Sequence, residues 1–165
     1  MINKYPVKII LDKKNNILES FDYYFNDGRS ALEYGVNLYG LNNSKILVPE
    51  YICDEVIQKL NQLNMRVEYY DLNDMLIPDY NKLIKLIDND VKSIMFINYF
   101  GLPINISENL KFAKQNNLIM IEDNAHGFSG SLKNRLLGNY GDIGFTSPRK
   151  NLNGMTGGLL DVKNK

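Results

Sequence analysis

The chain has 165 residues and carries 19 Lys and Arg against 19 Asp and Glu, so its net charge is zero. This length predicts one domain, and the balanced charge argues against a nucleic-acid-binding arm or a polybasic membrane patch. The one cysteine, Cys53, has no partner for a disulfide within these residues and is typical of a reducing compartment, so we expect a cytoplasmic protein. The apolar run 7–11 is too short for a signal peptide, and no segment has the length and character of a membrane span.

Residues 1–27 are expected to form an N-terminal arm that precedes a domain at 28–165. Within the arm, 7–11 has the pattern of an edge strand, and 21–25 is a cluster rich in aromatic residues that is expected to pack against the first helix.

Strands and helices then alternate along the chain. Short apolar or alternating runs predict strands at 46–49, 66–70, 93–98, 118–121, 143–146 and 157–162. The first helix is predicted to enter through a capping box made by Ser30 and Glu33 and to end at Gly40. Asp79 and Ser107 are predicted to cap two later helices.

This alternation favours an α/β fold, with a mostly parallel sheet and helices on both of its faces. The last predicted strand follows Lys150 after a loop that has no room for a crossover helix. We therefore expect this strand to run antiparallel to its neighbour.

Acidic and basic side chains follow two of the buried strands at short distance along the chain. Glu122 and Asp123 come after the run 118–121, and Lys150 comes shortly after 143–146. Open α/β sheets bind ligands at the carboxyl ends of their strands, so we expect an acid and an amine in one crevice. Pyridoxal phosphate needs this pair, because a lysine forms the imine with its aldehyde and an aspartate keeps its ring nitrogen protonated.

Four short motifs follow one another around these strand ends. They are Glu122 to His126, Gly138 to Gly144, Phe145 to Lys150, and the pair Gly157-Gly158. This set resembles the DegT/DnrJ/EryC1/StrS family of pyridoxal-phosphate-dependent sugar aminotransferases, and the resemblance extends from about Gly28 to Asp161. It implies the large domain of the fold-type-I transferases. Family members carry a second, smaller domain after it, so the resemblance also implies that a C-terminal small domain is missing from this chain.

The resemblance assigns roles to residues at the strand ends. Lys150 would hold the cofactor and act as the base that moves protons, while Asp123 would pair with the ring nitrogen, with Glu122 as a competing candidate. His126 would contact the ring or its phenolic oxygen, and the alternative is a hydrogen-bonded turn histidine. A metal site made by Asp123, His126 and Cys53 lacks the ligand spacing usual for zinc or iron, so no metal is expected.

Gly28, Arg29 and Ser30 would bind the cofactor phosphate, because a helix N-terminus offers free N–H groups and a partial positive charge. The alternative is an ordinary capping box, in which Glu33 places a negative charge one turn away. Ser147 would be a second phosphate ligand by resemblance, in a loop that is shorter than is common in the family.

Two further positions stay open. Arg149 would bind the phosphate or a substrate anion, or would be surface charge. Family members often stack an aromatic residue on the ring after the first strand. The aligned position here is Cys53, and Tyr51 is a possible substitute.

We therefore expect an aminotransferase that moves an amino group, for example from glutamate, to a nucleotide-linked keto sugar in polysaccharide or glycoside synthesis. Its partners would be these small molecules and, by resemblance, a second copy in a homodimer or the missing C-terminal half, with no nucleic acid and no membrane. The alternatives are a truncated, non-catalytic remnant or partner module of such an enzyme, and a nucleotide-binding α/β domain that uses Gly138 to Gly144. That glycine-rich stretch lacks the spacing of the dinucleotide fingerprint.

Overall fold

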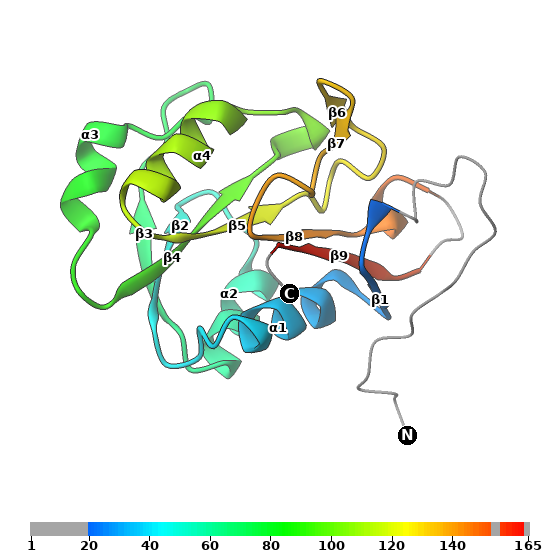
Figure 1. The fold of residues 1–165 in the computed structure, drawn as a ribbon, viewed down its shortest axis with the longest axis horizontal. Helices are drawn as coiled ribbons and strands as arrows, with labels where there is room; N and C mark the ends of the chain where they lie inside the picture. Colours follow the sequence, from blue (N-terminus) through cyan, green and yellow to red (C-terminus); the bar gives the residue numbers. More distant parts are fainter. Residues whose placement is uncertain (1–19, 153–155, 164–165) are drawn as a thin grey trace.

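The structure is a computed structural model that describes residues 20–152 and 156–163 (Figure 1). Its centre is a seven-stranded sheet with the strand order β1-β9-β8-β5-β4-β2-β3. The strands are β1 (Tyr23–Phe25), β2 (Lys45–Pro49), β3 (Arg66–Tyr70), β4 (Val91–Ile97), β5 (Ile119–Asp123), β8 (Ile143–Thr146) and β9 (Gly158–Val162). The six strands predicted from 46 onward are all present, while the predicted strand at 7–11 lies outside the described residues.

The centre of the sheet is parallel and one of its sides is antiparallel. Strand β2 runs parallel to both β3 and β4, and β5 runs parallel to both β4 and β8. Strand β9 is antiparallel to β8, and β1 is antiparallel to β9. The predicted mostly parallel α/β fold and the antiparallel last strand are therefore confirmed.

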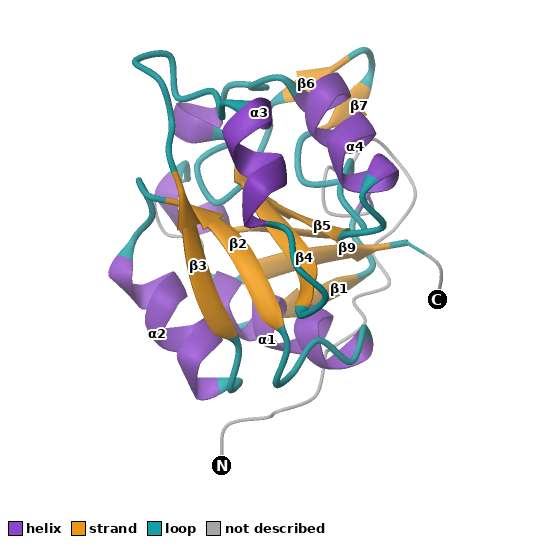
Figure 2. Cartoon of the chain, turned by 90° about the vertical axis from the view of Figure 1, so that its left-hand side faces the viewer, coloured by secondary structure: helices purple, strands orange, loops and turns teal. Residues whose placement is uncertain are grey.

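Helices cover both faces of the sheet, as predicted. They are α1 (Gly28–Leu38), α2 (Asp54–Gln62), α3 (Tyr80–Leu83) and α4 (Ile106–Gln115), with 3₁₀ turns at Ile84–Leu86, Tyr99–Gly101 and Pro148–Lys150. Figure 2 shows α1 and α2 on one face, and α3 and α4 on the other. Each face has its own apolar core.

The alternation of side chains along β5 divides these two cores. Met120 packs in the core under α3 and α4, together with Phe112, and Ile121 packs in the core under α1 and α2, together with Leu32. Each of these side chains is at most 7% exposed, and burying one contributes roughly 1.5–3 kcal/mol. The same alternation sends Glu122 and Asp123, the next two residues of β5, to opposite faces.

The predicted capping box at the start of α1 is wrong. Helix α1 begins at Gly28, and its N-cap is Asp27, whose carboxylate accepts a 2.8 Å hydrogen bond from the Ser30 amide. Ser30 already lies in the first turn, three positions after the N-cap, so its hydroxyl comes too late in the chain to act as the cap. Glu33 instead forms an ion pair of 2.9 Å with Lys59 on α2.

The other predicted helix ends are partly confirmed. Asp79 caps α3 by accepting hydrogen bonds from two amides of the first turn, and Gly40 follows α1 with a φ of 63°. The predicted cap at Ser107 is wrong, because α4 begins at Ile106. Its N-cap is Asn105, which has a φ of 47°, and asparagine tolerates this left-handed conformation better than most residues.

Two features were not predicted from the sequence. Strands β6 (Ser131–Leu132) and β7 (Arg135–Leu136) form a small hairpin, and both residues of its turn, Lys133 and Asn134, have positive φ. Residues 23–25, placed in the predicted N-terminal arm, form β1 at the edge of the sheet. No helix among the described residues is long and apolar enough to cross a membrane.

Candidate active site

Glu122 anchors a loop on the face of α3 and α4. Its buried carboxylate accepts hydrogen bonds from the amides of Gly138 (2.8 Å), Tyr140 (2.6 Å) and Gly141 (3.0 Å), and from the side-chain amide of Asn98 (2.8 Å). The glycine-rich stretch after the hairpin is thus folded around an acid of the chain itself. The glycine-rich motif therefore has a structural role as the loop that binds Glu122. Asp123 is the acid of β5 that faces α1 and α2.

Asp123 is buried at the carboxyl end of β5 and is 5% exposed. Burial raises the pKa of its carboxyl to about 6, although a 2.9 Å hydrogen bond from the Ala125 amide and the positive charge of Lys150 act in the opposite direction. Asp123 is therefore an acid held in an apolar setting with a cation near it.

The predicted acid and amine line the same cavity. The cavity has a volume of about 240 Å³ and lies at the carboxyl ends of β5 and β8. Its lining residues are Asp27, Gly28, Arg29, Cys53, Glu55, Val56, Asp123, Ala125, Phe145, Ser147, Arg149 and Lys150. Of the residues predicted from the sequence, the structure thus brings together Lys150, Asp123, Ser147, Gly28 and Arg29. Arg149 and Cys53, the two positions that the sequence left open, line the same cavity.

The start of α1 lies directly against the end of β8. A β-carbon on Gly28 would lie 3.6 Å from the β-carbon of Ser147, so the helix entrance and the hydroxyl loop are in van der Waals range. A β-carbon on Gly158 would lie 2.1 Å from the Asp27 carbonyl oxygen, which no side chain can tolerate. Gly158 of the Gly157-Gly158 motif therefore lets β9 pass beneath the first turn of α1 and holds that turn at the cavity.

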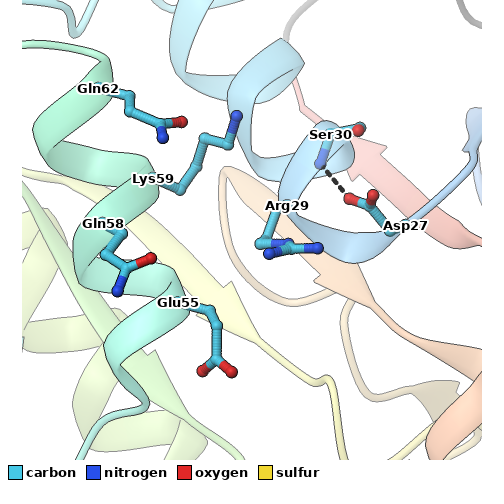
Figure 3. Close-up of a pocket in the computed structure, with 7 residues that line it drawn as sticks. All are labelled: Asp27, Arg29, Ser30, Glu55, Gln58, Lys59 and Gln62. Carbon is cyan, nitrogen blue, oxygen red and sulfur yellow. Dashed lines mark hydrogen bonds between the residues drawn. The ribbon is translucent and has the colours of Figure 1, made fainter. Parts of the chain in front are cut away.

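Ser30 does not line this cavity. It lines a second, polar cavity of about 190 Å³ between α1 and α2, together with Asp27, Arg29, Glu55, Gln58, Lys59 and Gln62 (Figure 3). In Figure 3 the Arg29 side chain extends from the first turn of α1 into the space between α1 and α2. Asp27, Arg29 and Glu55 line both cavities, and neither Asp27 nor Glu55 was predicted as a site residue. An aspartate directly before the glycine that opens a helix is the signal that could have identified Asp27.

His126 also lies away from the cavity lining. Its ring stacks on Phe100, with centroids 6.4 Å apart and an angle of 17° between the planes. Its carbonyl accepts a 2.9 Å hydrogen bond from the side-chain amide of Asn151. Burial lowers the pKa of His126, and the charge of Lys150 lowers it further. The turn interpretation accounts for these contacts, while a contact between His126 and the cofactor ring stays a prediction.

No aromatic ring lines the cavity at the position expected for stacking. Cys53 occupies the lining, as the alignment predicted, and Tyr51 packs on Tyr99 instead, with centroids 5.5 Å apart. The Tyr99 hydroxyl donates a 2.6 Å hydrogen bond to the Tyr51 carbonyl. Within 20–152 and 156–163, no three His, Cys, Asp or Glu side chains gather in a way that could hold a metal ion.

The model of the DegT/DnrJ/EryC1/StrS aminotransferase family matches residues 23–165. The chain belongs to this family. A curated relative, GDP-perosamine synthase of Escherichia coli O157:H7, is 37% identical over 57 residues, which are 34% of this chain and 16% of that protein.

Solved structures of related enzymes share the fold. The E. coli GDP-4-keto-6-deoxy-D-mannose-3-dehydratase with bound hydrated PLP superposes with a TM-score of 0.74 at 21% identity, covering 90% of this chain and 41% of that one. An aminotransferase from Psychrobacter cryohalolentis superposes with a TM-score of 0.78 at 18% identity, covering 90% of this chain and 39% of that one. The chain thus shares its fold with these enzymes, one of which holds pyridoxal phosphate. It spans about two fifths of the length of the two solved chains.

The pyridoxal phosphate predicted from the sequence is confirmed as the cofactor of this class of enzyme, because it is present in the dehydratase structure. The residues that line the cavity are of the chemical types that bind pyridoxal phosphate. One cavity holds a lysine, a buried acid, and a helix entrance beside a serine hydroxyl.

Proposed function

We propose that this chain binds pyridoxal phosphate in the 240 Å³ cavity and contributes the cofactor-binding part of an aminotransferase. The observation that carries the proposal is that Lys150 and Asp123 line one cavity together with the first turn of α1. These three features come from distant parts of the sequence, and an amine, an acid and an anion-binding helix end are what this cofactor requires.

Asp123 and Lys150 each have a definite task in this proposal. Pyridoxal phosphate supplies an electron sink for the pair of electrons left when a substrate carbon loses its proton. The Asp123 carboxylate holds a proton on the ring nitrogen, and its burial strengthens that interaction because little water screens it. The Lys150 amine anchors the cofactor and, when free, moves the proton as a base.

The phosphate would lie at the junction of α1 and β8. The Ser147 side chain lies next to the first turn of α1 there, and Arg29 lines the same cavity. The positive end of the helix and the Arg29 charge both favour an anion at this place.

The substrates would be an amino donor such as glutamate and a keto sugar linked to a nucleotide. The printed names of two relatives support this class, since one is a GDP-perosamine synthase and the other is a dehydratase of a GDP-linked keto sugar. Synthesis of a polysaccharide or glycoside in the cytoplasm is the setting that we propose.

A second copy of the chain, or the remainder of a longer protein, would complete the site. Tyr51 and Phe100 support this proposal, because they are 59% and 69% exposed and lie on segments next to the cavity and to His126. Since the chain spans about two fifths of its solved neighbours, cofactor binding without turnover is the second candidate function for the chain by itself.

Reductive trapping tests the proposal. The purified chain is mixed with pyridoxal phosphate, its visible spectrum is recorded, and the mixture is treated with borohydride and digested for mass spectrometry. We expect a yellow absorbance and a pyridoxyl mass on Lys150, both absent in Lys150→Ala and retained in Lys59→Ala. A label spread over surface lysines, or retained elsewhere at full yield in Lys150→Ala, would refute cofactor binding at this site.

Amino transfer is then assayed separately, with glutamate and a nucleotide-linked keto sugar. Transfer supports the aminotransferase, while labelling of Lys150 without transfer supports the second candidate.

A further inference from the structure

An acid of the chain itself occupies the helix end proposed to receive the cofactor phosphate. Asp27 is the N-cap of the 11-residue helix α1, lines both cavities, and accepts the 2.8 Å hydrogen bond from the Ser30 amide. Burial alone would raise the pKa of Asp27, but contacts with Ser30 and Arg29, including the amides of both, hold it below its usual value. The carboxylate is therefore a fixed negative charge that already uses amide donors of the first turn.

A phosphate at this place meets two opposing influences. The helix end, the Ser147 hydroxyl and the Arg29 guanidinium attract it. The Asp27 carboxylate repels it and competes for the same N–H groups, because a phosphate monoester carries a charge of about −1.5 to −2 at neutral pH. The other acid of this helix, Glu33, forms an ion pair with Lys59 and lines neither cavity.

We propose that Asp27 sets the preference of this site between phosphorylated and unphosphorylated forms of the cofactor, by holding the α1 amides and placing a negative charge beside the phosphate. The inference rests on the proposed function of the cavity. It assigns to Arg29 the role of offsetting the Asp27 charge, and to Ser147 the role of holding the phosphate on the β8 side, away from the occupied amides.

The variant that separates charge from shape is Asp27→Asn. Asparagine is nearly isosteric, keeps an oxygen that can accept the Ser30 amide, and is as good an N-cap as aspartate. Asp27→Ser is a second capping variant for the case that Asp27→Asn folds poorly. Glu33→Gln is the matched control, because it removes the same charge from the same helix at a residue that does not line the cavity.

The experiment measures dissociation constants for pyridoxal phosphate and for pyridoxal, which has the same ring and aldehyde but no phosphate. Binding is followed by absorbance and verified by borohydride trapping on Lys150. We expect Asp27→Asn to tighten pyridoxal phosphate binding about 10- to 100-fold, as for removal of a like charge near a partly solvated anion, and to change pyridoxal binding less than about twofold. In Glu33→Gln, both constants should stay within about twofold of the parent.

An unchanged or weaker affinity for pyridoxal phosphate in Asp27→Asn and Asp27→Ser would overturn the inference. An equal gain for both ligands would overturn it as well, because the effect would then not act on the phosphate. Either result, with Lys150 still labelled, leaves the proposed function standing. If Lys150 is labelled in neither the parent nor the variants, the proposed function and the inference fail together.

Discussion

Replacing Asp123 by asparagine is expected to stabilise the cofactor-free chain at pH 8, although it removes a residue proposed to hold the cofactor. Asp123 is 5% exposed, and its surroundings raise the pKa of its carboxyl from 3.8 to about 6. Such a carboxyl costs stability when it is ionised, because the unfolded chain hydrates the same charge freely. Asparagine keeps an oxygen for the Ala125 amide and carries no charge.

The size of the effect follows from the two pKa values. The gap between 3.8 and about 6 corresponds to about 3 kcal/mol of unfolding free energy once the carboxyl is ionised in both states. Because the pKa is higher in the folded state, the cost is absent below about pH 4, grows between pH 4 and 6, and is complete above pH 6. The advantage of Asp123→Asn should therefore be about 2–3 kcal/mol at pH 8 and shrink toward zero as the pH approaches 4.

Urea unfolding of the parent and the variant, followed by circular dichroism at several pH values between 4.5 and 8, measures this difference. A chain of this length should also show a rise in Tm of roughly 5–10 °C at pH 8. A loss of stability at pH 8, or a gain that does not depend on pH, would refute the assignment of Asp123 as a buried acid strained by desolvation. With pyridoxal phosphate present, the advantage of the variant should fall, because the parent charge then has the ring nitrogen as its partner.

Three further predictions concern the frame of the site. Glu122→Gln should destabilise the chain by about 2–4 kcal/mol in urea unfolding, because the glutamine amide has one acceptor oxygen where the carboxylate has two that bind four donors. A loss below about 0.5 kcal/mol would contradict the role of Glu122 as an anchor of the loop. Gly158→Ala should lower the Tm and weaken pyridoxal phosphate binding, since its β-carbon meets the Asp27 carbonyl at 2.1 Å, and parent-like values for both would show that β9 can move away. Asp161→Asn should stabilise the chain by about 1 kcal/mol at pH 8 and not at pH 4, because burial and the nearby Asp22 raise the pKa of Asp161 to about 6. The partial exposure of Asp161 keeps this gain small. Urea unfolding at the two pH values measures the difference, and a variant less stable than the parent at pH 8 would contradict the prediction.

Much of the fold could be read from local patterns. The strands are short apolar or alternating runs. The loop after Lys150 is too short for a crossover, so the direction of β9 followed from the length of that loop. Asp123 stands at the end of one buried strand and Lys150 comes shortly after another, and these positions were enough to predict that they line one cavity. In both cases the deciding interaction is between residues close in sequence, or is required by the geometry of parallel strands.

Other features depended on contacts between distant segments. Period two puts Glu122 and Asp123 on opposite faces, but only the packing of α1 against β8 and β9 decides which of these faces holds the cavity. His126 packs on Phe100 and Glu33 pairs with Lys59, because each finds its partner only after the chain has folded. The Asp27 cap is different, since its partner is the amide of Ser30 three residues away and the sequence carries a local signal for it. The sequence by itself thus determined which strands end in chemical groups, since that is local. The tertiary structure alone decided which charges share a cavity, because electrostatic and packing energies depend on distances that the order of residues does not contain.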